Sequence, residues 1–116
     1  HFLDAERIAC LPDRAWLINT ARGALVDEAA LYDALASGRL AGAALDVFER
    51  EPYEPVAPDK DLRALPNVIL TPHIGSATAA TRRAMMELAV QNVAAVLQGK
   101  PPITPVNPEV LPKARK

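Results

Sequence analysis

The residues best suited to chemistry are an arginine, a glutamate and a histidine, each standing shortly after a short apolar run. They are Arg22, Glu51 and His73, and a second carboxylate, Asp46, lies near the end of one of the same runs. Histidine is the side chain whose charge changes most readily near neutral pH, so it is the natural acid–base group of the set. If the apolar runs are parallel strands of one sheet, these groups meet along one edge. Open α/β sheets bind ligands at that carboxyl edge, so the pattern predicts the rim of an active site.

The runs that carry these groups are predicted strands at residues 15–19, 42–47 and 67–71. The first is almost wholly apolar, as expected for a strand that is covered on both faces of its sheet. Between the first two strands, a helix is predicted from about Glu28 to Ser37, with Asp27 as its N-cap. The first two strands and this helix form a β-α-β unit, and such crossovers make their two strands parallel.

Shorter signals predict the remaining elements. Asp4 can cap a first short helix, and the prolines between residues 51 and 66 leave room for only one helical turn there. Ser76 or Thr78 opens the longest predicted helix, which runs to about Gln98. From residue 100 onward the proline-rich tail is expected to be extended or disordered.

Composition narrows the function classes. The chain has 116 residues, half of them hydrophobic, and a formal net charge of −1, so one soluble domain at most is expected and nucleic acid is not an expected partner. No apolar run approaches the roughly 18 residues that span a bilayer, and no signal peptide is visible, so we expect a cytoplasmic protein without a membrane partner. The single cysteine, Cys10, excludes an internal disulfide.

The glycines point to an incomplete fold. The chain has five, and none forms the G-x-G-x-x-G phosphate loop that opens a dinucleotide-binding domain. Three parallel strands without that first unit predict an α/β fold, namely the C-terminal half of a Rossmann-like doubly wound parallel sheet, followed by a long helix.

Three blocks, at residues 18–27, 45–52 and 67–76, together resemble the D-isomer-specific 2-hydroxyacid dehydrogenases, in the right order and spacing. The resemblance implies an NAD-binding Rossmann domain inserted in a flavodoxin-like substrate domain. It assigns residues 1–99 to a partial NAD(P)-binding domain, including the long helix at about 77–98. Residues 100–116 would be an extended tail that returns toward the missing substrate domain.

The resemblance also assigns roles to individual residues. The implied catalytic residues are Arg22, which orients the substrate, Glu51, which pairs with the histidine, and His73, the acid–base group. The implied cofactor-binding residues, at the nicotinamide end, are Thr20, Ala21, Arg22, Asp46, His73 and Gly75. No metal site is predicted.

The chemistry of these groups suits that reaction. Hydride transfer to a 2-oxo acid leaves charge on the carbonyl oxygen, so a proton donor must lie within hydrogen-bond reach. A carboxylate beside the histidine favours its protonated form and fixes its ring. The Arg22 guanidinium presents a planar pair of donors that matches the substrate carboxylate. Asp46 can accept from the nicotinamide carboxamide, and the nicotinamide supplies the hydride.

The implied parent is therefore an enzyme that uses NAD or NADP to interconvert a small D-2-hydroxy acid and its 2-oxo acid, of the glyoxylate/hydroxypyruvate, lactate or phosphoglycerate type. Its expected partners are that substrate, the missing N-terminal half and a second copy in a homodimer. The chain by itself is predicted to be inactive. The alternative is a non-catalytic binding or dimerisation module that keeps relict catalytic residues.

Taken one at a time, the same residues have simpler interpretations. A histidine after a strand can be a hydrogen-bonded loop residue, and Arg22 can cap a helix or pair with Asp27. Asp46 at a strand end can simply cap a turn. For Glu49, beside Glu51, a solvated charge run is the preferred interpretation.

Overall fold

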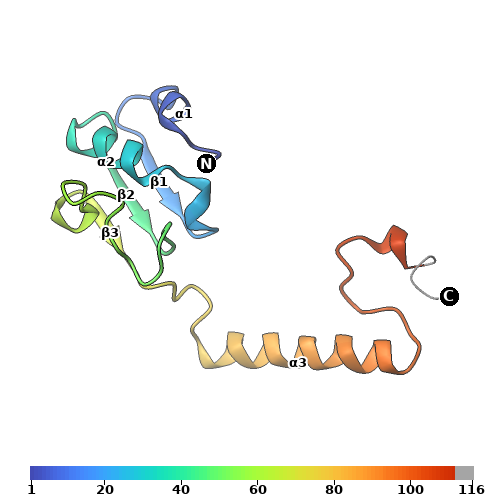
Figure 1. The fold of residues 1–116 in the computed structure, drawn as a ribbon. Helices are drawn as coiled ribbons and strands as arrows, with labels where there is room; N and C mark the ends of the chain where they lie inside the picture. The colour runs from blue at the N-terminus through green and yellow to red at the C-terminus, as the bar shows by residue number, and fades with distance from the viewer. Residues whose placement is uncertain (112–116) are drawn as a thin grey trace. The chain divides into compact units, whose positions relative to one another are not determined.

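The computed structural model describes residues 1–111, and the chain divides after Gly75 into two compact units. The first unit contains a small parallel sheet with two helices, and the second, which begins at Ser76, contains one long helix (Figure 1). The division falls just after the block that contains His73, so every predicted site residue lies in the first unit.

The regular elements of the first unit follow one another in the order that the sequence predicts. They are α1 (Ala5–Ala9), β1 (Trp16–Asn19), the 3-10 turn η1 (Gly23–Leu25), α2 (Glu28–Ala36), β2 (Gly42–Leu45), the 3-10 turn η2 (Leu62–Ala64) and β3 (Val68–Leu70). The caps are those predicted: the Asp4 side chain accepts from the backbone N–H of Arg7, and Asp27 accepts from that of Ala30. Local capping chemistry therefore sets where both helices begin.

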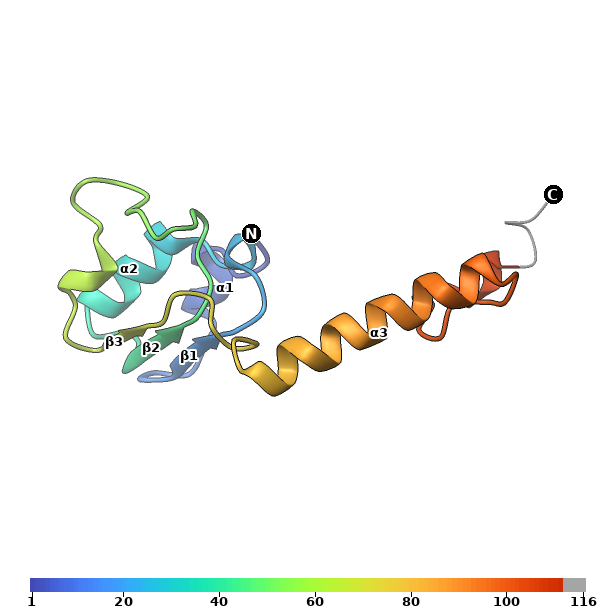
Figure 2. The ribbon, with the colours of Figure 1, turned by 90° about the horizontal axis from the view of Figure 1, so that it is seen from below.

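The three strands are parallel and lie in the order β1-β2-β3 (Figure 2). In the register of the sheet, Leu45 of β2 pairs with Asn19 of β1 and with Leu70 of β3. The carboxyl ends of all three strands are therefore aligned, and the loops that follow them start from one edge. This confirms the predicted parallel sheet and brings the chemistry-bearing loops to the same side.

The core lies on one face of the sheet. Leu17 and Ala43 on that face are buried, as is Leu31 of α2, which has no exposed surface. On the opposite face, Trp16 and Ile18 of β1 are 62% and 71% exposed. The prediction that the first strand is covered on both faces is wrong for this chain. Its apolar sequence suits two covered faces, but α1 and α2 cover only one.

The second unit contains α3 (Ala79–Leu97), capped by Thr78, whose side-chain oxygen accepts from the backbone N–H of Thr81. The predicted long helix is thus confirmed, and Thr78 rather than Ser76 begins it. The tail turns back along the helix, since the Asn92 side chain hydrogen-bonds both the backbone N–H and the hydroxyl of Thr104. A last 3-10 turn, η3, spans Pro108–Val110. Residues 112–116 of the predicted tail lie outside the described residues, and no helix among the described residues is long and apolar enough to cross a membrane.

Candidate active site

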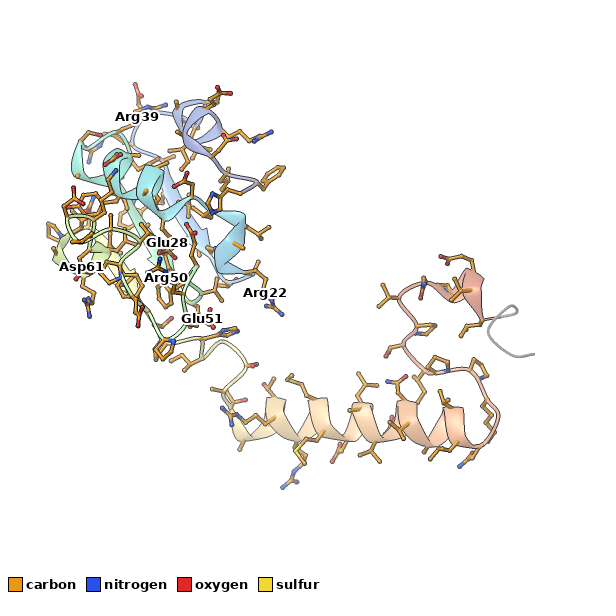
Figure 3. The ribbon with its side chains drawn as sticks, viewed as in Figure 1. Arg22, Glu28, Arg39, Arg50, Glu51 and Asp61 are labelled. Atoms are coloured by element: carbon orange, nitrogen blue, oxygen red, sulfur yellow. The ribbon has the colours of Figure 1, made fainter. Side chains whose placement is uncertain are left out.

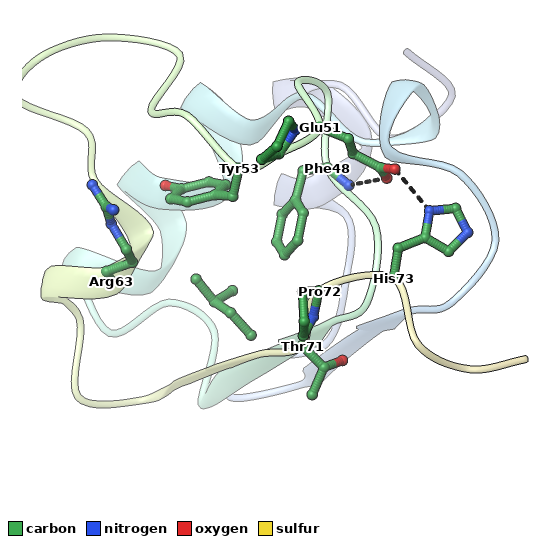
Figure 4. Close-up of a pocket in the computed structure, with 9 residues that line it drawn as sticks. Phe48, Glu51, Tyr53, Arg63, Thr71, Pro72 and His73 are labelled. Carbon is green, nitrogen blue, oxygen red and sulfur yellow. Dashed lines mark hydrogen bonds and ion pairs between the residues drawn. The ribbon is translucent and has the colours of Figure 1, made fainter. Parts of the chain in front are cut away.

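His73 and Glu51 form a direct pair. The imidazole Nδ1 lies 2.7 Å from Oε2 of Glu51, and Oε1 of the same carboxylate accepts from the backbone N–H of Phe48 at 3.1 Å (Figure 4). The hydrogen bond with His73, followed by that with Phe48, holds the pKa of the Glu51 carboxyl below its ordinary value. Glu51 is therefore an ionised acceptor, and an ionised carboxylate can only accept, so the proton between them belongs to Nδ1.

The second ring nitrogen of His73, Nε2, takes no part in the pair with Glu51. Nε2 lies on the side of the ring that faces away from Glu51 (Figure 4), and the side chain is 45% exposed. With Nδ1 donating to Glu51, Nε2 can hold or release a proton at the surface of the unit. The pair therefore has the geometry of a carboxylate-oriented acid–base histidine.

Asp46 follows β2 directly and is buried. Its Oδ1 accepts from the Thr71 hydroxyl at 2.5 Å and from the backbone N–H of Ile74 at 2.9 Å, while Oδ2 accepts from that of Gly75 at 2.8 Å. The Thr71 bond first, and then the backbone donors, hold the pKa of Asp46 below its ordinary value. The carboxylate thus binds the loop at residues before and after His73.

Arg22 lies in the loop that follows β1, and its exposed guanidinium extends from the unit (Figure 3). The loop is held by Asn19, whose buried side chain accepts from the backbone N–H of Ala21 at 3.1 Å and donates to the Arg22 carbonyl at 3.0 Å. Sequence reasoning missed Asn19. The available signal was a lone amide at the end of an otherwise apolar strand, because a buried amide needs partners and the nearest are in the following loop.

The loops after β1 and β2 touch through Gly23. A Cβ atom at Gly23 would lie 1.9 Å from the backbone C and O of Phe48, so only glycine fits this approach. The contact brings Arg22 close enough to Glu51 for its positive charge to contribute to the lowered pKa of that carboxyl. Arg22, Glu51 and His73 therefore lie on three neighbouring loops of one sheet edge, as the sequence predicts.

Glu49 is hydrogen-bonded to Glu28, so its preferred interpretation as part of a solvated charge run is wrong. Its carboxylate accepts from the backbone N–H of Glu28 at 2.9 Å, and the Glu28 carboxylate accepts in return from that of Glu49 at 2.7 Å. Glu28 is 3% exposed, and burial raises the pKa of its carboxyl. This reciprocal pair joins the first turn of α2 to the loop after β2.

One group of possible metal-binding side chains occurs among the described residues: His1, Asp27 and Glu49. The imidazole Nε2 of His1 lies 3.1 Å from Glu49, and Nδ1 lies 3.7 Å from Asp27. One ring nitrogen and one oxygen of each carboxylate lie within 4.8 Å of one another.

The other predicted site residues fall at the same edge. Thr20 and Ala21 are exposed in the loop after β1, and Gly75 is exposed at the end of the first unit, where its N–H binds Asp46.

His73 and Glu51 also line a pocket of about 710 Å³ (Figure 4). The residues lining it are Phe48, Glu51, Pro52, Tyr53, Arg63, Leu70, Thr71, Pro72 and His73.

Comparison with known proteins assigns the fold to a family. Residues 1–75, the whole first unit, match the model of the "D-isomer specific 2-hydroxyacid dehydrogenase, NAD binding domain". The chain belongs to this family. The resemblance seen in the three sequence blocks is thereby confirmed, as is the Rossmann-type parallel sheet.

Similar proteins carry related names. The chain is 48% identical over its full length to a glyoxylate reductase of Pyrococcus furiosus, and 49% identical over 91% of its length to a hydroxyphenylpyruvate reductase of Plectranthus scutellarioides. Among solved structures, the NADPH-dependent glyoxylate/hydroxypyruvate reductase of Sinorhizobium meliloti, in complex with NADP and malonate, matches 90% of this chain with a TM-score of 0.79 and 46% identity.

The matches cover nearly all of this chain but only part of each relative. The chain spans 33% of each of the two curated relatives named above and 31% of the Sinorhizobium meliloti structure. The chain thus corresponds to about one third of the length of these relatives.

Proposed function

We propose that this chain is the catalytic-histidine part of an NAD(P)-dependent D-2-hydroxyacid dehydrogenase that acts on a small 2-oxo acid of the glyoxylate or hydroxypyruvate type. The observation that carries the proposal is the Glu51–His73 pair, 2.7 Å apart at the carboxyl edge of a sheet from this family. The reductase names of the similar proteins favour an enzyme over a non-catalytic module.

In this mechanism His73 moves the proton. During reduction its Nε2 donates to the carbonyl oxygen of the 2-oxo acid, and during oxidation Nε2 accepts the proton of the hydroxyl. Glu51 holds Nδ1 and stabilises the imidazolium that exists before donation. Arg22, on the exposed loop after β1, binds the substrate carboxylate through two parallel N–H donors.

The nicotinamide cofactor, when bound, supplies the hydride. Asp46 fits the carboxamide group of the nicotinamide as a hydrogen-bond acceptor. Its Oδ2 accepts only one hydrogen bond from the described residues, and a carboxylate oxygen has room for two. We place Thr20, Ala21, Asp46 and Gly75 at this end, beside Arg22 and His73. The choice between NAD and NADP depends on the adenosine end, to which none of these residues is assigned.

The proposed context follows from the uncovered surfaces. The open edge of β1 and the bare face with Trp16 and Ile18 suit further strands and helices from an N-terminal part of the protein. We also propose a homodimer and a cytoplasmic location for the complete enzyme, and retain residues 1–99 as its partial cofactor domain.

The test joins this chain to the remaining two thirds of the Pyrococcus furiosus glyoxylate reductase, in place of the matching third. The chain alone should give no turnover of NADH or NADPH with glyoxylate or hydroxypyruvate, whereas the joined protein should be active. His73→Ala should lower its kcat by about 10²–10⁴-fold, the usual contribution of general acid–base catalysis. His1→Ala, a matched imidazole control, should stay within a few-fold of the parent. Activity that survives His73→Ala would refute the proposal.

A further inference from the structure

We propose that Asp46 and Thr71 form a clamp that positions His73, so that Asp46 supports catalysis through the histidine loop as well as through any contact with the cofactor. The inference rests on the proposed function, because it assigns a consequence to the position of the His73 ring. It concerns positioning residues, since neither side chain has to touch the reacting atoms.

The first observation is that the clamp bonds bracket His73. Thr71, two residues before the histidine, binds Oδ1 of Asp46 through its hydroxyl, and Ile74, directly after it, binds the same oxygen through its backbone N–H. Gly75 binds Oδ2. One buried carboxylate directly after β2 therefore holds the chain on both sides of the histidine, which itself makes no bond to Asp46 among the described residues.

The second observation is the backbone of His73, which has φ of +53°. This is the left-handed region, which L-residues with a side chain rarely adopt and which persists only where surrounding contacts impose it. The bracketing bonds supply that constraint. If they weaken, the loop can relax toward the common right-handed or extended regions, and the imidazole then turns away from Glu51.

The third observation is the close fit at Gly75. A Cβ atom at this position would lie 3.1 Å from Oδ2 of Asp46, a tight contact at the oxygen that binds the Gly75 N–H. The small residue at this position thus has an explanation within the clamp. Asp46 itself is anchored to the sheet, because its backbone N–H donates to the carbonyl of Asn19 at 3.0 Å.

The clamp can be separated from cofactor binding by changing Thr71 instead of Asp46. Thr71→Val keeps the shape of the side chain and the Asp46 carboxylate but removes the hydroxyl donor, whereas Thr71→Ser keeps the donor. Thr104→Val is the matched control: this hydroxyl also takes part in a side-chain hydrogen bond, here as the acceptor from Asn92, but it lies in the second unit. The three variants are made in the joined, active protein described above.

Two measurements are taken on each variant: kcat and the KM for NADPH in glyoxylate reduction, and the hydrogen-exchange rates of the Ile74 and Gly75 amides by NMR. Thr71→Val should lower kcat by about tenfold or more, change the KM for NADPH less than twofold, and speed exchange at both amides. In Thr71→Ser, kcat and both exchange rates should stay near the parent values, and Thr104→Val should resemble the parent.

Unchanged kcat in Thr71→Val, or a loss carried by the KM for NADPH, would overturn the clamp as a catalytic device. If the parent joined protein is itself inactive, the proposed function fails, and the exchange rates still decide on the clamp. Faster exchange in Thr71→Val alone would then support it, and equal rates in Thr71→Val and the parent would overturn it.

Discussion

Replacing Gly23 by alanine should damage the site more than its small size suggests. The added methyl would lie 1.9 Å from two backbone atoms of Phe48 and 2.5 Å from the backbone nitrogen of Glu49, whereas ordinary contact begins near 3.4 Å. The obstacles are backbone atoms of a buried residue, so they cannot rotate away as a side chain would. The loop after β1 and the loop after β2 must therefore separate by about 1.5 Å.

That separation sets the size of the expected loss of activity. Arg22 directly precedes Gly23, so the guanidinium moves relative to Glu51 and His73 by a similar distance. A misplacement of about 1 Å can cost roughly 10²-fold in rate, so kcat/KM of the joined protein should fall by about two orders of magnitude. The larger part should appear in the KM for glyoxylate, because Arg22 binds the substrate carboxylate. Overpacking should also lower the free energy of unfolding by about 1–3 kcal/mol.

Gly38→Ala is the matched control. Gly38 follows α2 with φ of +76°, and an added Cβ would meet no atom within 4 Å, so the substitution brings backbone strain without a collision. It should cost about 1–2 kcal/mol of stability and leave the kinetic constants unchanged. The assay is steady-state glyoxylate reduction together with urea unfolding for both variants. A Gly23→Ala protein with the KM and kcat of the parent would refute the reasoning, as would an equal loss of activity in Gly38→Ala.

Two further predictions concern carboxylates with shifted pKa values. Glu51→Gln removes the charge that stabilises the His73 imidazolium. The alkaline limb of a pH profile of kcat/KM for reduction should therefore move to lower pH. An unmoved limb would mean that the pair in the structure has no catalytic role. Burial raises the pKa of Glu28 above 4.5, so the stability tied to its proton is present below that pH and is lost as the pH rises through the folded-state value. The free energy of unfolding of Glu28→Gln should therefore rise relative to that of the parent as the pH goes from 4 to 7. Urea unfolding at both pH values measures it, and an equal difference between the two proteins at pH 4 and pH 7 would contradict the inference.

The elements of the fold were largely predictable because their signals are local. Asp4, Asp27 and Thr78 each accept from a backbone N–H three residues later, and short polar side chains at that spacing are visible in the sequence itself. The parallel order of the strands follows from the helical crossover between β1 and β2. The family resemblance assigned the Glu51–His73 pair, and the 2.7 Å contact agrees with it.

The missed features depend on contacts that no local pattern in the sequence marks. The pairing of Glu28 with Glu49 joins residues 21 positions apart, and no local pattern marks two acids as each other's backbone acceptors. The bare face of β1 is a different case. Its apolar sequence predicts a cover on both faces, but α1 and α2 pack against only one of them.

Each site loop is held by a polar side chain at the carboxyl end of a strand, and this makes the site depend on the register of the sheet. Asn19 holds the Arg22 loop after β1, and Asp46, one residue beyond the end of β2, holds the His73 loop after β3. In the observed register, Asn19, Leu45 and Leu70 lie side by side, which puts Asp46 level with the loop that it binds. A shift of one residue in β2 would turn Asp46 to the other face of the sheet and leave the Ile74 and Gly75 amides without their acceptor. The packing of Leu45 and Ala43 against α2 opposes that shift, so the buried core and the position of His73 are set by the same strand.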